Sequence, residues 1–349
     1  MRILIDIGHP AHVHFFKHAI WQLQERGDEV LISARDKDVT LALLDEYDFE
    51  YQILSAIGNG RLGMYKEFLW REWALIQLIR KFAPDVVTAV GGVFIAPACK
   101  LLNKPSIVFT DTEHVSIDRY LTYPLASVIC TPTSFKKELG SSHLRYQGFQ
   151  ELAYLHPKYF QPDPKILEEL GVTENEPYIL VRFVTWKASH DVGHHGFSEP
   201  LKHEVLASLS KYGRIFITSE GTLPSAFEPY RINLSPSKIH HALAYASLYI
   251  GEGATMATEA GLLGTPSIYT SSLVGTMGNF EVLMHTHNLV YSYQDPREAL
   301  QSAVSILEKP EVQIEWRRRR DKLLADTIDV TCFAVDLIEN AQNKVNILG

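Results

Sequence analysis

The sequence is poor in cysteine and lacks the segments that mark exported or membrane-spanning chains. Its 349 residues include three cysteines, which are far apart and share no paired spacing: Cys99, Cys130 and Cys332. A disulfide framework or a cysteine-based zinc site is therefore not expected, and a reducing cytoplasm suits this thiol content. No apolar run is long enough to span a bilayer, and the strand-like start at residues 1–7 predicts no signal peptide.

Basic residues are in the minority, because 33 Lys and Arg accompany 41 Asp and Glu, for a formal net charge of −8. Binding to a phosphate backbone needs a basic surface, so we expect no nucleic-acid partner. The composition is that of a soluble globular protein, with 46% hydrophobic residues and a mean hydropathy of −0.05. A chain of this length is longer than one that usually folds around a single hydrophobic core, so two domains are expected.

Strand-like and helix-like segments alternate along the chain. Apolar strands are predicted at 3–7, 29–33, 51–54, 85–90, 106–110 and 127–130, and, after a proline-containing linker near 150–170, at 178–183, 214–218, 248–251, 267–270 and 289–293. Helices are predicted at 13–26, 39–45, 64–82 and 96–102, after residue 118, and at 201–211, 238–246, 254–263, 280–285 and 297–308.

Short apolar strands without alternation, separated by helices, are typical of an α/β fold whose parallel sheets are covered on both faces. We predict two Rossmann-like domains, at residues 1–155 and 170–310, with C-terminal helices at 311–349 packing back on the first. Their sheets would face each other across a cleft, and the ligand would bind at the carboxyl ends of the strands.

The segment with the clearest chemistry starts at Gly251 and reads Gly-Glu-Gly-Ala-Thr-Met-Ala-Thr-Glu-Ala-Gly. Small residues follow a predicted strand and open a predicted helix, so free N–H groups and the positive helix end would converge on a phosphate. We expect the phosphate at Gly253, Ala254, Thr255 and Met256. Glu259, about two turns into the helix, would accept hydrogen bonds from sugar hydroxyls. A diphosphate beside a diol indicates a nucleotide.

Cationic side chains follow the first strand of the second half. Arg182 or Lys187 is expected near the diphosphate, and His190 is expected to line the cleft. An Asp and two His farther along offer metal-ligand types, but neighbouring glycines and the absence of a helical histidine pair favour a solvated loop. No metal is therefore expected.

Histidines cluster where the first predicted strand ends, in the run Gly8-His-Pro-Ala-His-Val-His-Phe-Phe16. A neutral imidazole at this edge of the sheet would act as a general base toward an acceptor hydroxyl. His12 is the preferred candidate and His14 the second. The alternative is that His9 only shapes the turn, while His12 or His14 is a surface side chain.

A second polar cluster, Asp111, Glu113 and His114, follows the strand at 106–110 and is expected at the same sheet edge. These side chains are candidates for acid–base chemistry, although Asp and Thr are also ordinary helix caps.

Two segments bear on membrane contact. The helix at 64–82 mixes aromatic and aliphatic residues with Lys and Arg; packing on the sheet is the usual role, and a membrane surface is the alternative. The run Trp316-Arg-Arg-Arg-Arg320 is expected to form a solvated helix face, with attraction to anionic lipid as an additional reading.

The order of these motifs resembles the GT-B superfamily of nucleotide-sugar enzymes over nearly the whole chain. The N-acetylglucosaminyltransferase of lipid II synthesis and the non-hydrolysing UDP-N-acetylglucosamine 2-epimerases are similar in pattern. The histidine-rich opening more closely resembles an uncharacterised prokaryotic family, carried as a domain of unknown function and found near surface-polysaccharide genes.

The resemblance implies that the turn at Gly253 holds the nucleotide, that Glu259 holds the ribose, and that Asn279 and Glu281 add donor contacts. It places His12 near the acceptor. The turn from Gly8 departs from the transferase's glycine-rich turn, so acceptor handling must differ.

The expected function is that of a metal-independent glycosyltransferase in cell-surface polysaccharide or glycolipid synthesis. It would use a nucleotide-diphosphate sugar, with UDP favoured, a sugar or lipid-linked acceptor, and no cofactor. The alternatives are a nucleotide-sugar epimerase or hydrolase and a non-catalytic nucleotide-sugar binding protein. The expected location is cytoplasmic, with peripheral contact to the inner face of the membrane.

Overall fold

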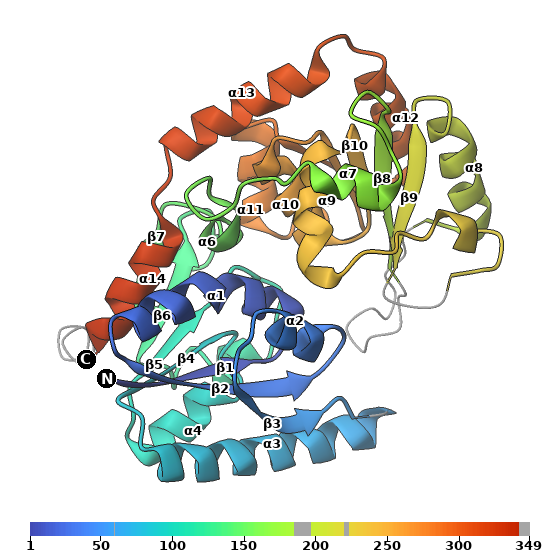
Figure 1. Cartoon of the computed structure of the whole chain (residues 1–349). Coiled ribbons are helices and arrows are strands. Elements are labelled where there is room, and N and C mark those ends of the chain that lie inside the picture. The colour runs from blue at the N-terminus through green and yellow to red at the C-terminus, as the bar shows by residue number, and fades with distance from the viewer. Residues whose placement is uncertain (59, 185–196, 220–222, 342–349) are drawn as a thin grey trace. The chain divides into compact units, whose positions relative to one another are not determined.

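The computed structural model describes the whole chain except residues 59, 185–196, 220–222 and 342–349. Contacts divide the chain into two units (Figure 1): Met1–Tyr159 with Ile328–Gly349, and Phe160–Thr327. Each unit is built around one parallel sheet with helices on its faces, so the prediction of two Rossmann-like domains is confirmed.

The first unit contains a 7-stranded parallel sheet in the order β3-β2-β1-β4-β5-β6-β7. Its strands are β1 (Arg2–Ile7), β2 (Glu29–Asp36), β3 (Tyr51–Ala56), β4 (Val86–Val90), β5 (Ser106–Phe109), β6 (Val128–Pro132) and β7 (His143–Tyr146). Its helices are α1 (Pro10–Glu25), α2 (Thr40–Glu46), α3 (Gly60–Phe82), α4 (Ile95–Leu102), α5 (Asp118–Leu121), α6 (Leu152–Leu155) and α14 (Val330–Glu339).

The second unit contains a 5-stranded parallel sheet in the order β12-β11-β10-β8-β9. Its strands are β8 (Tyr178–Phe183), β9 (Arg214–Ser219), β10 (Leu248–Gly251), β11 (Ser267–Thr270) and β12 (Val290–Tyr293). Its α-helices are α7 (Lys165–Leu170), α8 (Glu199–Leu209), α9 (Ile239–Tyr245), α10 (Ala254–Leu263), α11 (Gly278–Glu281), α12 (Pro296–Leu307) and α13 (Val312–Ala325). Short η1 (Glu228–Tyr230), η2 (Pro236–Lys238) and the π-helical η3 (Val282–Thr286) complete it.

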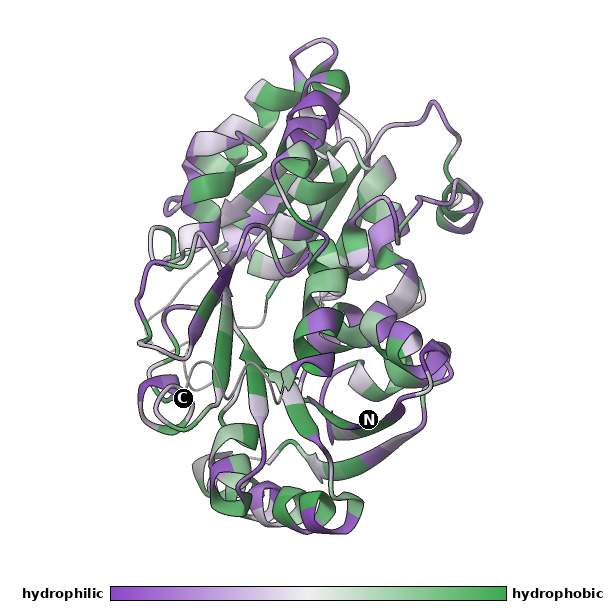
Figure 2. Ribbon diagram, turned by 90° about the vertical axis from the view of Figure 1, so that its left-hand side faces the viewer, coloured by the Kyte–Doolittle hydropathy of each residue, from purple (hydrophilic) through white to green (hydrophobic). Residues whose placement is uncertain are grey.

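The inner strands fold as they do because their side chains are apolar on both faces. All four residues of β5 and of β10 are buried, and the strands of both sheets are largely green in Figure 2. A parallel sheet covered by helices on both sides buries continuous apolar strands, which explains the absence of polar alternation. In the described part of the chain, no helix combines the length and apolar character that crossing a bilayer requires.

Three sequence predictions differ from the structure. The segment near 150–170, predicted as a linker, contains the short helices α6 and α7. The strand β7 was not predicted, because His143 and Arg145 make this edge strand polar. The C-terminal helices do not both pack on the first unit. α13 belongs to the second unit, which extends to Thr327, whereas α14 packs against α1 of the first.

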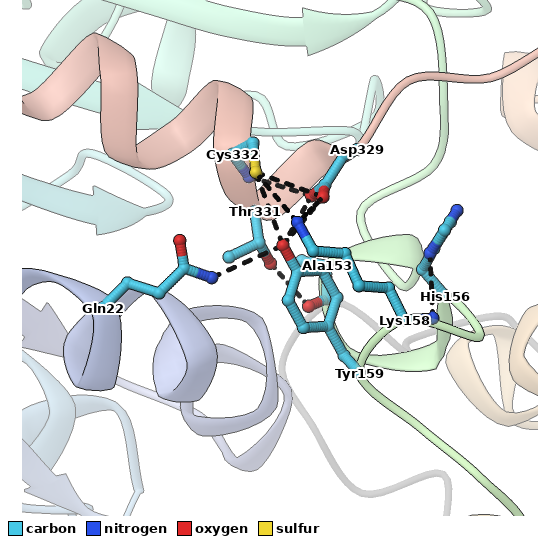
Figure 3. Close-up of polar contacts among 8 residues, drawn as sticks. All are labelled: Gln22, Ala153, His156, Lys158, Tyr159, Asp329, Thr331 and Cys332. Carbon is cyan, nitrogen blue, oxygen red and sulfur yellow. Dashed lines mark hydrogen bonds and ion pairs between the residues drawn. The ribbon is translucent and has the colours of Figure 1, made fainter.

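The chain leaves the first unit after Tyr159 and returns to it at Ile328, and hydrogen bonds connect these two segments (Figure 3). Asp329 caps α14 by accepting a hydrogen bond from the Cys332 amide, and it also accepts from Tyr159 Oη across 2.8 Å and from Lys158 Nζ across 2.7 Å. Ile328 N donates to the Gln147 carbonyl nearby. These contacts join the segment at which the chain leaves the first unit to the segment at which it returns. They hold the start of α14 on the first unit.

A buried polar network lies under the β1–β3 side of the first sheet. Arg71 of α3 is fully buried, and its guanidinium donates to Asp6 Oδ1 across 2.7 Å and to Ser55 Oγ across 3.2 Å. Beside it, Arg35 donates two hydrogen bonds to the Glu67 carboxylate, across 2.6 and 2.7 Å. Because Asp6 precedes the histidine-rich turn by two residues, the network fixes the strand end from which that turn begins.

We expect Arg71→Met to reduce the free energy of unfolding by about 3–5 kcal/mol, because it leaves the buried Asp6 carboxylate without its cation. Arg80→Met, the same change at an exposed position of α3, is the matched control and should stay within about 0.5 kcal/mol. Urea denaturation followed by circular dichroism measures both. Equal effects of the two changes would contradict a stabilising role for the Asp6–Arg71 pair.

Candidate functional site

The entrance to α10 in the second unit has the geometry of an anion site. Gly253 is the N-cap and has no side chain with which to accept from the first N–H groups of the helix. Thr255 is exposed, and Gly253, Ala254 and Met256 are partly exposed, so these amides lie at an accessible surface. The ten-residue helix adds the positive end of its dipole at the same point.

Arg182, at the end of the neighbouring strand β8, lies directly against this turn. A Cβ atom on Gly253 would lie 2.7 Å from Arg182 Cδ, and one on Gly251 would lie 2.8 Å from Arg182 Cβ. The guanidinium donates to Thr218 Oγ1 across 3.5 Å, and that hydroxyl is 3.7 Å from Met256 Sδ. The structure therefore brings the predicted cation and the predicted phosphate turn together, and glycine at 251 and 253 makes the close approach possible.

Glu252, between the two glycines, organises the same region and was not singled out in the sequence. Its buried carboxylate accepts from Val184 N across 2.7 Å and from Phe197 N across 2.6 Å. Its own amide donates to the Arg182 carbonyl. The carboxylate thus joins the end of β8 to the segment that leads into α8, and its negative charge is balanced locally by these amides. Only its place inside the Gly-Glu-Gly turn could have drawn attention to it.

Glu259, predicted to bind a ribose, lies on α10 as expected but is almost fully buried. His240 of α9 is paired with it, with Nε2 2.9 Å from Glu259 Oε1 and side-chain exposures of 2% and 6%. Sequence reasoning missed His240, because nothing in the local pattern links residues 19 positions apart. Little of the carboxylate is accessible, so the ribose contact stays a prediction.

Two of the remaining donor-side residues, Asn279 and Glu281, lie on α11, the helix that follows β11. Asn279 is buried in α11, and Glu281 at its end is half exposed, 3.6 Å from His285 Nε2. Lys187 and His190 lie outside the described residues. Among the residues that are described, no three His, Cys, Asp or Glu side chains gather closely enough to hold a metal ion.

His12 lies at the start of α1, next to the end of β1. Its Nδ1 accepts a hydrogen bond from the Gly8 amide across 3.2 Å. Burial is the main reason why the pKa of His12 lies well below its ordinary value. Three neighbours lower it further: His9, Lys37 and Arg71. The ring is therefore neutral at neutral pH.

This hydrogen bond changes the role predicted for His12. A neutral imidazole that accepts at Nδ1 carries its proton on Nε2, which makes Nε2 a donor. A general base needs a free ring nitrogen lone pair, so the base role does not fit this arrangement. The arrangement suits donation from Nε2 to an oxygen atom of a substrate. His9 shapes the turn, as the alternative reading held, because its Nδ1 accepts from Ala11 N.

His14 points into the first unit and not toward the strand ends. It is 6% exposed, its Nδ1 lies 3.4 Å from Tyr47 Oη, and its ring lies 5.3 Å from that of Tyr154. This burial gives no support to its predicted position at the ligand edge, and its role stays a prediction. The helical period explains the difference, because two positions along α1 rotate a side chain by about 200° from His12.

The polar cluster after β5 contains one buried residue, Glu113, and two residues that are at least partly exposed, Asp111 and His114. Asp111 is partly exposed, and its Oδ1 accepts from Thr112 Oγ1 across 3.1 Å. Glu113 is 3% exposed and accepts from Lys136 N across 3.2 Å, so it holds a neighbouring loop. His114 is exposed. Of the two acidic residues, Asp111 is the more exposed.

Comparison with known sequences places the chain in one family. A family described as "Protein of unknown function (DUF354)" matches residues 1–340. An uncharacterized protein of Methanocaldococcus jannaschii is 27% identical over 331 residues, which cover 88% of this chain and 95% of that protein.

Solved structures share the fold at low identity. MurG of Acinetobacter baumannii matches with a TM-score of 0.59 and 15% identity, covering 97% of this chain and 100% of that one. The UDP-GlcNAc 2-epimerase of Neisseria meningitidis, bound to UDP-GlcNAc, matches with a TM-score of 0.65 and 12% identity, covering 99% and 100%. The fold is therefore GT-B, as the sequence predicted.

The partly buried histidines His12 and His18 predict that the protein loses stability in acid. Burial lowers the pKa of His12 and lowers that of His18 to about 4. As the pH falls from about 6.5 to 4, the unfolded chain binds protons that the folded chain does not, so the free energy of unfolding decreases. Urea denaturation at a series of pH values should show this slope, and His12→Asn should reduce it.

His114→Asn is the matched control for this measurement, because His114 is exposed. We expect it to leave the pH slope unchanged. A His12→Asn protein with the wild-type slope would contradict the burial of a neutral ring at this position.

Proposed function

The chain belongs to the DUF354 family, and we propose that it is a metal-independent glycosyltransferase that uses a nucleotide-diphosphate sugar. The single observation that carries the proposal is the contact of Arg182 with the entrance to α10. Two sources of positive potential, a guanidinium and a helix N-terminus, converge there on a surface of small residues. A diphosphate is the group that such a surface suits.

In the proposed reaction, the bond between the anomeric carbon and the diphosphate oxygen breaks, and negative charge grows on the leaving diphosphate. The amides of Ala254, Thr255 and Met256, together with Arg182, would stabilise that charge. Because these groups supply the positive charge, we propose that neither a metal nor a cofactor takes part. Glu259, Asn279 and Glu281 would bind the remainder of the donor.

The first unit would handle the acceptor. The proton of the acceptor hydroxyl would pass to the Asp111 carboxylate while the oxygen of that hydroxyl forms the new bond to the anomeric carbon. His12 would donate from Nε2 to a substrate oxygen and thereby orient it, as its bond to Gly8 favours. Asp111 takes the place of His12 as the proposed base because it is a partly exposed carboxylate at the end of β5.

The rest of the proposal concerns the donor and the setting. Solved structures of the same fold are bound to UDP-GlcNAc or to thymidine diphosphate, which supports a nucleoside-diphosphate donor, and we propose UDP as the nucleotide. We propose a role in cell-surface polysaccharide or glycolipid synthesis, with a sugar or lipid-linked acceptor. The protein would work in the cytoplasm, with peripheral contact to the inner face of the membrane.

The nucleotide site is tested by the affinity for UDP and thymidine diphosphate, measured by calorimetry. We expect Arg182→Ala to weaken binding by about 10- to 100-fold, because charge-assisted hydrogen bonds to the diphosphate are lost. Arg214→Ala is the matched control, since Arg214 begins β9 at the opposite end of the sheet and donates to the Gly171 carbonyl. Equal weakening by both changes, or tight binding of uridine without phosphate, would overturn this site.

The reaction type is tested by incubating the protein with UDP-N-acetylglucosamine, first alone and then with a panel of sugar and lipid-linked acceptors. Release of UDP that depends on the acceptor and persists in EDTA supports the transferase. Formation of an epimer or free sugar without acceptor favours the epimerase or hydrolase. Binding with no turnover in any mixture favours a binding protein.

The base is tested in whichever acceptor mixture gives turnover. Asp111→Asn should lower kcat by about 10²- to 10⁴-fold while leaving the affinity for UDP unchanged. Asp48→Asn, an exposed position before β3, should match the wild type. A kcat for Asp111→Asn within a few-fold of wild type would remove Asp111 from the mechanism.

A further inference from the structure

Exposed apolar side chains are concentrated in one short stretch of the first unit. Of the 16 large hydrophobic side chains that are exposed in the described part of the chain, eight lie within residues 53–73. They are Ile53, Ile57, Leu62, Met64, Tyr65, Leu69, Trp70 and Trp73. Single exposed apolar residues are normal on a protein surface, but a concentration of this kind marks an interaction site.

Six of the eight lie on α3, the long helix at the outer edge of the first unit (Figure 1). Four of them repeat at intervals of three and four residues and so lie on one face: Leu62, Tyr65, Leu69 and Trp73. Their exposed fractions lie between 51% and 79%. Trp70 extends this face, because its ring centroid is 5.0 Å from that of Trp73. We call these five side chains the aromatic face of α3.

The opposite side of α3 explains why this face remains outside. Leu75, Leu78 and Ile79 are buried against the sheet, and Arg71 and Glu67 belong to the buried polar network. The helix is therefore held in place by its inner side. The aromatic face is not needed for the packing of the unit.

The charges around the aromatic face have one sign. The exposed charged side chains described on α3 are Lys66, Arg80 and Lys81. The two acidic residues of the helix are not exposed: Glu67 is buried against Arg35, and Glu72 is partly buried. The chain as a whole has a formal net charge of −8, so this helix departs from the average in both hydrophobicity and charge.

We propose that α3 docks on an anionic lipid surface. The aromatic face would enter the headgroup region, where Trp and Tyr rings are favoured, and Lys66, Arg80 and Lys81 would bind lipid phosphates. A helix with an apolar face flanked by basic residues lies in the plane of such an interface. The proposal names a surface for the membrane contact in the proposed function, but it does not depend on the reaction.

The basic helix α13 lacks the matching apolar face. Trp316 is 1% exposed, Arg319 is paired with Glu315, and Arg320 is paired with Asp321. Ile314 is the single large apolar side chain exposed on this helix, and no aromatic side chain is exposed there, so α13 offers charge without an extended apolar face. It therefore provides a control in the same protein.

The test is cosedimentation of the full chain with vesicles of phosphatidylcholine alone, or of equal parts phosphatidylcholine and phosphatidylglycerol. We expect binding to the anionic vesicles, weakened by high salt. Trp70→Ser/Trp73→Ser and Lys66→Glu/Arg80→Glu should each weaken this binding by at least about tenfold. Arg318→Glu/Lys322→Glu, at exposed positions of α13, should stay within about twofold of wild type.

All substituted positions are at least partly exposed, and melting temperatures near the wild-type value would show that the variants are folded. Absence of binding by the wild type, or equal losses for the α3 and α13 variants, would overturn the proposal. So would a wild-type dimer that the tryptophan variant converts to a monomer without a change in vesicle binding, because α3 would then bind a second copy. The assay contains no nucleotide sugar, so its outcome is separate from that of the proposed reaction.

Discussion

The second unit depends on the close packing of Arg182 against the Gly251–Gly253 turn. A side chain at either glycine would collide with Arg182, and at Gly251 the collision includes the Arg182 carbonyl, only 2.9 Å away. The absence of both Cβ atoms lets β8 and β10 end side by side with a guanidinium over the entrance to α10. Glu252 completes the turn by accepting two backbone hydrogen bonds. The positive potential of the site therefore follows from backbone geometry as much as from the charge of the arginine.

The first unit builds its strand ends by a different means. Charged side chains are buried there in pairs, with Asp6 bonded to Arg71 and Glu67 bonded to Arg35. Arg71 also lowers the pKa of His12, so the network under the sheet influences the state of the ring above it. The helix that supplies Arg71 and Glu67 to the inside presents the aromatic face to the outside. One helix thus connects the strand ends with the surface proposed for lipid.

Three groups at these strand ends have a chemistry that their residue types alone do not fix. The Gly8 amide donates to His12 Nδ1, which favours a donor role at Nε2 over the predicted base role. Glu259 lies inside the unit with its Oε1 2.9 Å from His240 Nε2. Asp111 is partly exposed, whereas Glu113, two residues later, is buried and accepts from a backbone amide. For Glu259 and Glu113 the hydrogen-bond partners lie on distant parts of the chain, so residue type alone did not predict them.

The sequence by itself determined the fold class and most strands, because hydrophobic period and small-residue turns are local properties. The same patterns predicted two sites at the strand ends. β10, α10 and β11 end where the pattern of residues predicted. The tertiary structure alone decided that His14 is internal, that His240 meets Glu259, that Glu252 joins two segments, and that α13 and α14 belong to different units. Each of these facts concerns residues that are brought together by packing across elements, and a local pattern carries no information about such contacts.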